Sequence, residues 1–122
     1  MKDSDISTRV AEFILTRDNE ELAALDEGKL AEVFGIDRQL LSRSFKRRQK
    51  MAVDRFILRE RLYRAFFWIE KARGISGREL SRQLRFDRFE DFGREFKKLF
   101  LLTPDRFIAL KRRQGKPKLA LP

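Results

Sequence analysis

The chain has 122 residues, which is enough for one compact domain or two very small ones and argues against a large enclosed active site. It contains neither cysteine nor histidine, so disulfide bridges, Cys/His zinc sites and imidazole acid–base catalysis are excluded. Lys and Arg outnumber Asp and Glu by 29 to 19, and the formal net charge of +10 predicts binding to a polyanion, nucleic acid before an anionic membrane.

Apolar residues recur at intervals of three and four, which is typical of α-helices, and no run alternates over the length of a strand. The pattern predicts a first helix from about Ile6 to Thr16. A second helix is expected after a cap at Asp26, and Gly35 should end it in the left-handed conformation that glycine favours. Asp37 is expected to start the third helix.

The longest predicted helix begins at Asp54 with the run DRFILRERLYRAFFWIEKA, and nineteen residues at a rise of 1.5 Å would reach roughly 28 Å. Two capping boxes follow it, Ser76 with Glu79 and Asp87 with Glu90. In such a box the cap side chain and the third helical residue each accept the other's backbone N–H. The boxes therefore predict the starts of a fifth and a sixth helix.

A seventh helix should begin at Thr103 and Pro104, because proline at the first helical position loses no hydrogen bond. The chain also repeats itself. The segment FKRRQKMAVDRFI from Phe45 and the segment FKKLFLLTPDRFI from Phe96 start 51 residues apart and share six of thirteen residues. Earlier residues match at an offset of 50, so the second copy carries one extra residue.

Each copy reads as a short helix, a tight turn and a longer helix that ends in a basic cluster, which is the pattern of a helix-turn-helix unit. The expected fold class is all-α, with about seven helices in two helix-turn-helix subdomains joined by a long connecting helix. The expected ranges are a disordered N-terminus at 1–5, the first subdomain at 6–52, the connecting helix at 53–73, the second subdomain at 74–113 and a disordered tail at 114–122.

Two segments carry a resemblance to a known family. LLSRSFK ends the first unit at residues 40–46, and RFDRFEDFGREFKKLFLLTPDRFI covers residues 85–108 of the second. With these motifs the chain resembles the DNA-binding domain of the AraC/XylS family of bacterial transcription regulators, over about Val10 to Leu110. The resemblance implies a cytoplasmic, sequence-specific binder of double-stranded DNA, with no cofactor, whose third and sixth helices enter successive major grooves.

The resemblance also assigns base-reading positions. They fall on Gln39, Ser42 and Arg43 in the first unit and on Phe89, Glu90 and Arg94 in the second. Arginine suits guanine, glutamine suits adenine, glutamate accepts from cytosine, and phenylalanine touches the thymine methyl group. Two alternatives stay open: the arginines could form ion pairs within the protein, and Glu90 could serve only as a helix cap. We expect the first unit to dominate recognition, since Asp91 adds a further negative charge to the second.

The basic clusters at the ends of the two reading helices are expected to neutralise DNA phosphates without reading sequence. These residues are Lys46, Arg47, Arg48, Lys97 and Lys98. The phenylalanines are expected to build the two cores. The first group is Phe13, Phe34, Phe45 and Phe56, and the second is Phe86, Phe92, Phe96, Phe100 and Phe107.

Three positions where the family has glycine hold Lys50, Arg85 and Leu101 here, so these turns are expected either to take another shape or to be strained. Such departures motivate an alternative function, a diverged module that binds DNA non-specifically or binds a protein such as RNA polymerase. Exposure of the first unit's reading residues would favour DNA. An enzyme is not expected, because the chain lacks a phosphate-binding loop and a metal-binding acid cluster.

Overall fold

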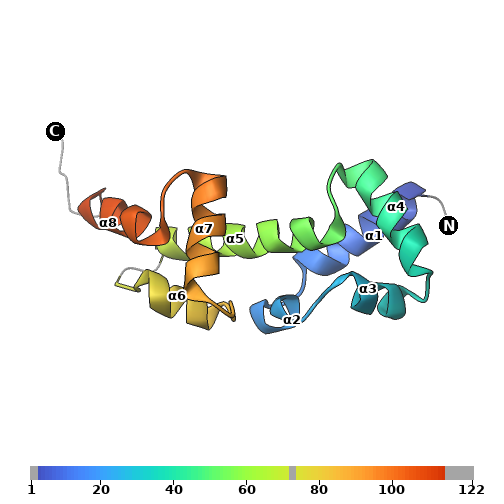
Figure 1. The fold of residues 1–122 in the computed structure, drawn as a ribbon, viewed down its shortest axis with the longest axis horizontal. Coiled ribbons are helices and arrows are strands. Elements are labelled where there is room, and N and C mark those ends of the chain that lie inside the picture. Colours follow the sequence, from blue (N-terminus) through green and yellow to red (C-terminus); the bar gives the residue numbers. More distant parts are fainter. Residues whose placement is uncertain (1–2, 72–73, 115–122) are drawn as a thin grey trace. The chain divides into compact units, whose positions relative to one another are not determined.

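The computed structural model describes residues 3–71 and 74–114, and all the regular secondary structure in these ranges is helical (Figure 1). The eight helices there are α1 (Asp3–Leu15), α2 (Asn19–Ala23), α3 (Glu27–Phe34), α4 (Arg38–Gln49), α5 (Val53–Lys71), α6 (Gly77–Gln83), α7 (Phe89–Phe100) and α8 (Pro104–Gln114). The expected all-α class is confirmed, with one helix more than the sequence predicted.

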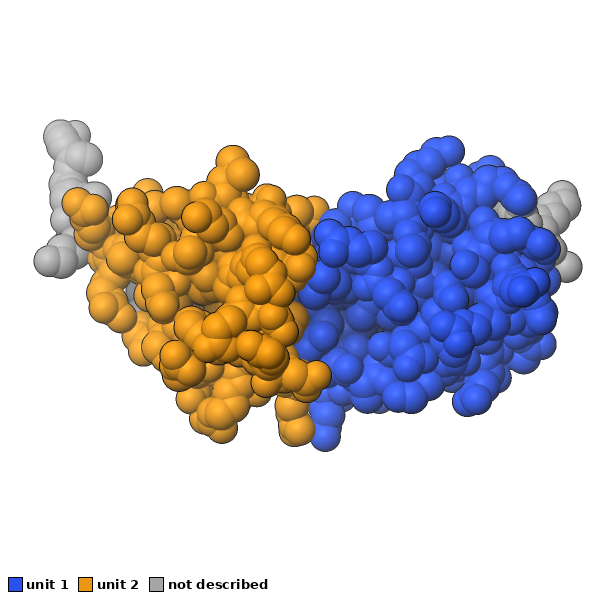
Figure 2. Space-filling view, in the orientation of Figure 1, with its two compact units in different colours: residues 1–61 blue, residues 62–122 orange. Residues whose placement is uncertain are grey.

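The chain divides into two compact units, Met1–Arg61 and Leu62–Pro122, which Figure 2 colours separately. The boundary falls inside α5, so the predicted connecting helix contributes its first part to one unit and its last part to the other. Each unit consequently builds its own core on a segment of the same helix.

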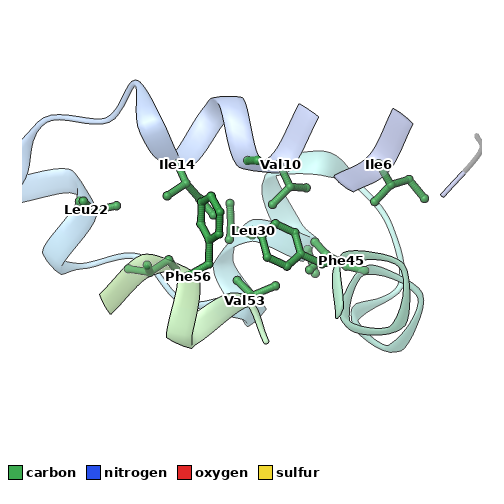
Figure 3. Close-up of a cluster of buried hydrophobic side chains, with 12 residues drawn as sticks. Ile6, Val10, Ile14, Leu22, Leu30, Phe45, Val53 and Phe56 are labelled. Carbon is green, nitrogen blue, oxygen red and sulfur yellow. The ribbon is translucent and has the colours of Figure 1, made fainter. Parts of the chain in front are cut away.

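In the first unit, α1 and α3 both pack against α4. Ile6, Val10 and Ile14 lie four residues apart on α1, and this spacing brings them to one face of the helix. Figure 3 shows them facing Phe45 of α4 and Phe56 of α5, whose rings meet edge to face with centroids 5.1 Å apart. All five side chains are buried, so this cluster holds α4 to its unit.

In the second unit, α6, α7 and α8 pack on one another, and the core combines phenylalanines with buried aliphatic residues such as Leu80 and Ile108. Phe92 and Phe96 of α7 are fully buried. Phe66 of α5 lies 4.7 Å from Phe100 and 4.7 Å from Phe107, measured between ring centroids. The prediction that the two groups of phenylalanines belong to two cores is confirmed, although it missed Phe66.

The first helix starts earlier than expected. It begins at Asp3, so residues 3–5 are helical and the prediction of disorder there was wrong. Asp5 places a negative charge near the start of this helix, where it interacts favourably with the positive end of the helix dipole. Residue 114 is likewise helical, as the last residue of α8. The remainder of the predicted disordered ends, residues 1–2 and 115–122, lies outside the described residues.

Helix α2 was not predicted, because five residues are too few to show a helical period. Its capping box is complete. Asp18 Oδ1 accepts the Glu21 N–H at 2.7 Å, and Glu21 Oε1 accepts the Asp18 N–H at 3.0 Å. Leu22, one residue further on, is fully buried and anchors this short helix. The sequence signal was the cap pattern DNEE rather than the period.

The predicted capping box of α7 was wrong. The cap residue is Arg88, whose side chain makes no capping hydrogen bond, so Asp87 stands one residue too early and Glu90 has no reciprocal role. Only one of the two hydrogen bonds of the α6 capping box forms. Ser76 Oγ accepts the Glu79 N–H at 3.0 Å, whereas the Glu79 carboxylate accepts from Arg82 and Gln83 in its own helix. Neither box therefore forms in full.

The turns keep the left-handed conformation without glycine. Lys50, Arg85 and Leu101 have φ angles of 64°, 64° and 72°, close to the 64° of Gly35. The accompanying backbone bonds repeat as well, since Ile36 N–H donates to Ala31 O at 3.1 Å and Phe86 N–H donates to Ser81 O at 3.0 Å. The two helix-turn-helix copies thus share their turn geometry, and the three side chains impose a local strain of about 1 kcal/mol each.

Candidate nucleic-acid interface

Helix α4 is fixed on its inner side and at its start. Asp37 Oδ2 accepts the Leu40 N–H at 3.1 Å and caps the first turn. Leu41, Ser44 and Phe45 are buried against the core of the first unit. The opposite side of α4 is left to the polar residues of the sequence QLLSRSFK. The core therefore determines which α4 side chains face outward.

The three base-reading candidates of α4 follow the spacing i, i+3 and i+4, which brings side chains together on one helix face. Gln39 and Arg43 are exposed, and Ser42 is half-buried. The first turn of α4 contains no acidic residue. Among the described residues, no carboxylate forms an ion pair with Arg43, so its guanidinium is available to a ligand.

The basic cluster of α4 lies in its last turn, where Lys46, Arg47 and Arg48 are exposed. Positive charge there complements the negative end of the helix dipole. The next residue, Gln49, donates through Nε2 to the hydroxyl of Ser7 at 2.7 Å, and Ser7 is buried in α1. This bond holds the last turn of α4, and with it the cluster, against α1.

An ion pair sets α4 against α3. Arg38 Nε lies 3.0 Å from Glu27 Oε1, and this hydrogen bond raises the pKa of Arg38 above its ordinary value. In the second unit, a hydrogen bond from backbone to side chain joins α6 to α8. Gly77 N–H donates to Asp105 Oδ1 of α8 at 3.0 Å. A Cβ atom on Gly77 would lie 2.7 Å from that oxygen, so a larger residue here would have to displace the Asp105 carboxylate.

Helix α7 buries Phe92 and Phe96 and leaves Glu90 and Arg94 exposed. Phe89 is only half-buried, and the Arg78 guanidinium of α6 lies 4.5 Å from the centroid of its ring. Phe89 therefore packs against α6 as well as facing outward.

Arg94 of α7 and Arg88, the cap residue before this helix, both form ion pairs within the protein. Arg94 Nη2 donates to Asp91 Oδ1 at 2.7 Å, and Arg88 Nε lies 3.7 Å from Asp91 Oδ2. The ion-pair alternative that the sequence left open is realised for Arg94.

In the basic cluster of α7, Lys97 and Lys98 are exposed, and Lys98 Nζ lies 3.6 Å from Glu95 Oε2.

A shallow groove of about 380 Å³ follows the turn between α6 and α7. Arg82 and Glu79 form a close pair on its wall, and the hydrogen bond from Arg82, followed by one from Gln83, lowers the pKa of Glu79. Within residues 3–71 and 74–114, no group of three carboxylates lies close enough to hold a metal ion. Every helix in those ranges is too short or too polar to cross a lipid bilayer.

Comparison with solved structures places the fold. The chain is similar to the C-terminal domain of AraT, a response regulator from Geobacillus stearothermophilus, at a TM-score of 0.76 and 17% identity over 95% of this chain and 91% of that one. An AraC-type transcriptional regulator from Chromobacterium violaceum matches at 0.75 and 20%, over 92% and 96%. The chain has the fold of an AraC-type DNA-binding domain.

A third match to this AraC-type fold is the DNA-binding domain of AdpA, a global transcriptional factor, solved in complex with a target DNA. It gives a TM-score of 0.70 and 16% identity over 93% of this chain and 95% of that one. No family model and no curated protein matches the sequence. The resemblance to AraC-type domains that the sequence motifs suggested is therefore confirmed at the level of the fold, and its third and sixth predicted helices are α4 and α7.

Proposed function

We propose that this chain is a bacterial transcription regulator that binds double-stranded DNA in a sequence-specific manner, with α4 as its main reading helix. One observation carries the proposal. Gln39 and Arg43 are exposed on one face of α4, the described residues offer Arg43 no ion pair, and a basic turn completes the same helix. The AraC-type fold supports the same function.

The chemistry of α4 suits the major groove, which is about 12 Å wide and admits an α-helix. The Arg43 guanidinium would donate two hydrogen bonds to O6 and N7 of guanine. The Gln39 amide would pair with N6 and N7 of adenine. Ser42, being half-buried, would contribute at most a single hydroxyl contact. We therefore expect a short site that contains a guanine and an adenine.

Phosphate contacts would come from the basic clusters of the two reading helices. Lys46, Arg47 and Arg48 surround the end of α4, and Lys97 and Lys98 the end of α7. Such contacts fix the position of the protein on the duplex and carry no sequence information. With the basic end of α7 beside the DNA backbone, the second unit would add phosphate contacts to those of the first.

The competing function is a diverged module that binds a protein partner, such as RNA polymerase, through the same basic surface. That reading expects the α4 residues to pack into the fold, whereas Gln39 and Arg43 are exposed. We accordingly favour DNA, with the protein acting on the nucleoid in the bacterial cytoplasm, without catalysis and without a cofactor.

Selection from a random double-stranded DNA pool tests the proposal. The wild-type chain and an Arg43→Ala variant are incubated with the pool at low and at physiological salt, and the bound fraction is sequenced. We expect an enriched motif from the wild type and the loss of preference at one base position from the variant. Salt-sensitive binding with no enriched motif would refute sequence-specific recognition and favour the protein-binding module.

A further inference from the structure

We propose that Asp91 is a specificity-determining residue of the second unit, which withdraws Arg88 and Arg94 from DNA and so leaves base reading to α4. The inference rests on the proposed DNA-binding function and assigns base reading to the first unit alone. In this arrangement α7 contributes phosphate contacts through its basic end, while the residues of its first turn make no contact with the bases.

The geometry places one carboxylate between two arginines. Arg94 Nη2 lies 2.7 Å from Asp91 Oδ1, and Arg88 Nε lies 3.7 Å from Asp91 Oδ2. Both arginines stand three residues from Asp91, one on each side along the helix. The side chain of Asp91 is 48% exposed, and those of Arg88 and Arg94 are 68% and 58% exposed. All three groups are consequently accessible from solvent, at the start of the helix that the proposed function places against DNA.

The first unit provides an internal comparison at an offset of 51 residues. Arg94 corresponds to Arg43, and Asp91 corresponds to Leu40, a half-buried apolar residue that cannot pair with an arginine. Acidic residues are absent from the first turn of α4, whereas α7 carries Glu90 and Asp91 there. The arginine is thus paired with a carboxylate in the second unit, whereas its counterpart Arg43 has no ion pair among the described residues.

An exposed ion pair is weak in water, so its effect depends on what happens when DNA approaches. Docking would strip water from Asp91 and bring its negative charge close to the phosphates. Like charges that face each other across an interface lower the binding affinity. Asp91 is therefore far more costly in the bound state than in the free protein, and it disfavours close insertion of α7.

Asp91 also has a local structural role that the test must separate. The cap residue of α7, Arg88, makes no side-chain capping bond, and a carboxylate in the first turn offsets the positive end of the helix dipole. Loss of this interaction would lower the melting temperature and leave the selected DNA sequence unchanged. Glu90 supplies a matched control, because it is exposed in the same turn, and among the described residues it forms no ion pair.

The experiment compares the wild type with Asp91→Asn, Glu90→Gln and Asp91→Asn/Arg94→Ala, each selected on the random DNA pool after thermal unfolding has shown that it folds. For Asp91→Asn we expect a second half-site about one helical turn from the first. We also expect affinity for that extended site to rise on the order of tenfold, with a salt slope steeper by about 1 to 2. The double variant should select the wild-type motif. Glu90→Gln removes an equal charge but releases no arginine, so it should raise affinity by less than Asp91→Asn does.

Several results would overturn the inference while the proposed function stands. They are an unchanged motif for Asp91→Asn, an equal gain for Glu90→Gln, and a wild-type motif that already contains two half-sites. A tenfold loss of affinity on changing Arg94 to Ala in the wild-type background would have the same meaning, because it would show that Arg94 already contacts DNA. If the wild type enriches no motif at all, the proposed function fails and the inference fails with it.

Discussion

At the scale of single residues, three positions with a left-handed backbone, which favours glycine, hold residues with a Cβ atom. Leu101 is the extreme case, with a φ of 72° and a side chain that is 80% exposed. An exposed leucine gains little from burial, so nothing in its own packing offsets the steric cost of its Cβ atom. Its position after the α7 basic cluster matches Lys50 after the α4 cluster.

Leu101→Gly should therefore stabilise the protein. We expect the free energy of unfolding to rise by about 1 kcal/mol relative to Leu101→Ala, which keeps the Cβ atom and removes the rest of the side chain. Urea unfolding, followed by the fluorescence of Trp68 in the second unit, measures the difference. A glycine variant less stable than the alanine variant would show that the φ of residue 101 carries no strain.

At the scale of helices, the most accurate predictions came from caps and periods. Asp26 and Asp37 cap α3 and α4 as expected, and Gly35 ends α3 in the left-handed conformation. The cap of α7 was missed because the extra residue of the second copy separates Asp87 from the helix, so Asp87 does not take the place that Asp37 has before α4. Helix α2 was missed since its five residues have no measurable period.

The same limits apply to the candidate interface. Which α4 residues face outward followed from the apolar residues Leu41 and Phe45, so the exposure of Gln39 and Arg43 was predictable. The pairing of Arg94 was not. Several acidic residues lie near Arg94 in the sequence. Only the side-chain conformations of the folded chain show that its ion-pair partner is Asp91.

Helix α7 contains a glycine that its surroundings do not require. A Cβ atom added to Gly93 would meet nothing within 4 Å outside its own helix. Gly93→Ala should raise the free energy of unfolding by about 1 kcal/mol, because alanine loses less backbone entropy in a helix. Thermal and urea unfolding of the two proteins measure the change. Unchanged stability would mean that α7 is already ordered by its tertiary contacts alone.

At the scale of the whole molecule, the net charge of +10 should govern the salt dependence of DNA binding. If about six phosphates are engaged, the logarithm of the association constant should fall with the logarithm of salt concentration at a slope of roughly −5. Lys46→Ala should reduce that slope by about 1 and leave the selected motif unchanged. A variant that keeps the full slope would place Lys46 away from the phosphates.

The most direct test of base reading by α4 is a double-mutant cycle across the interface. Arg43→Ala is combined with 7-deazaguanine, which lacks the N7 acceptor, at the guanine of the selected site. If Arg43 bonds that guanine, each change alone should weaken binding by about 1–3 kcal/mol, and the two together should cost little more than one. Fully additive losses would mean that Arg43 does not contact this base and would contradict base reading by α4.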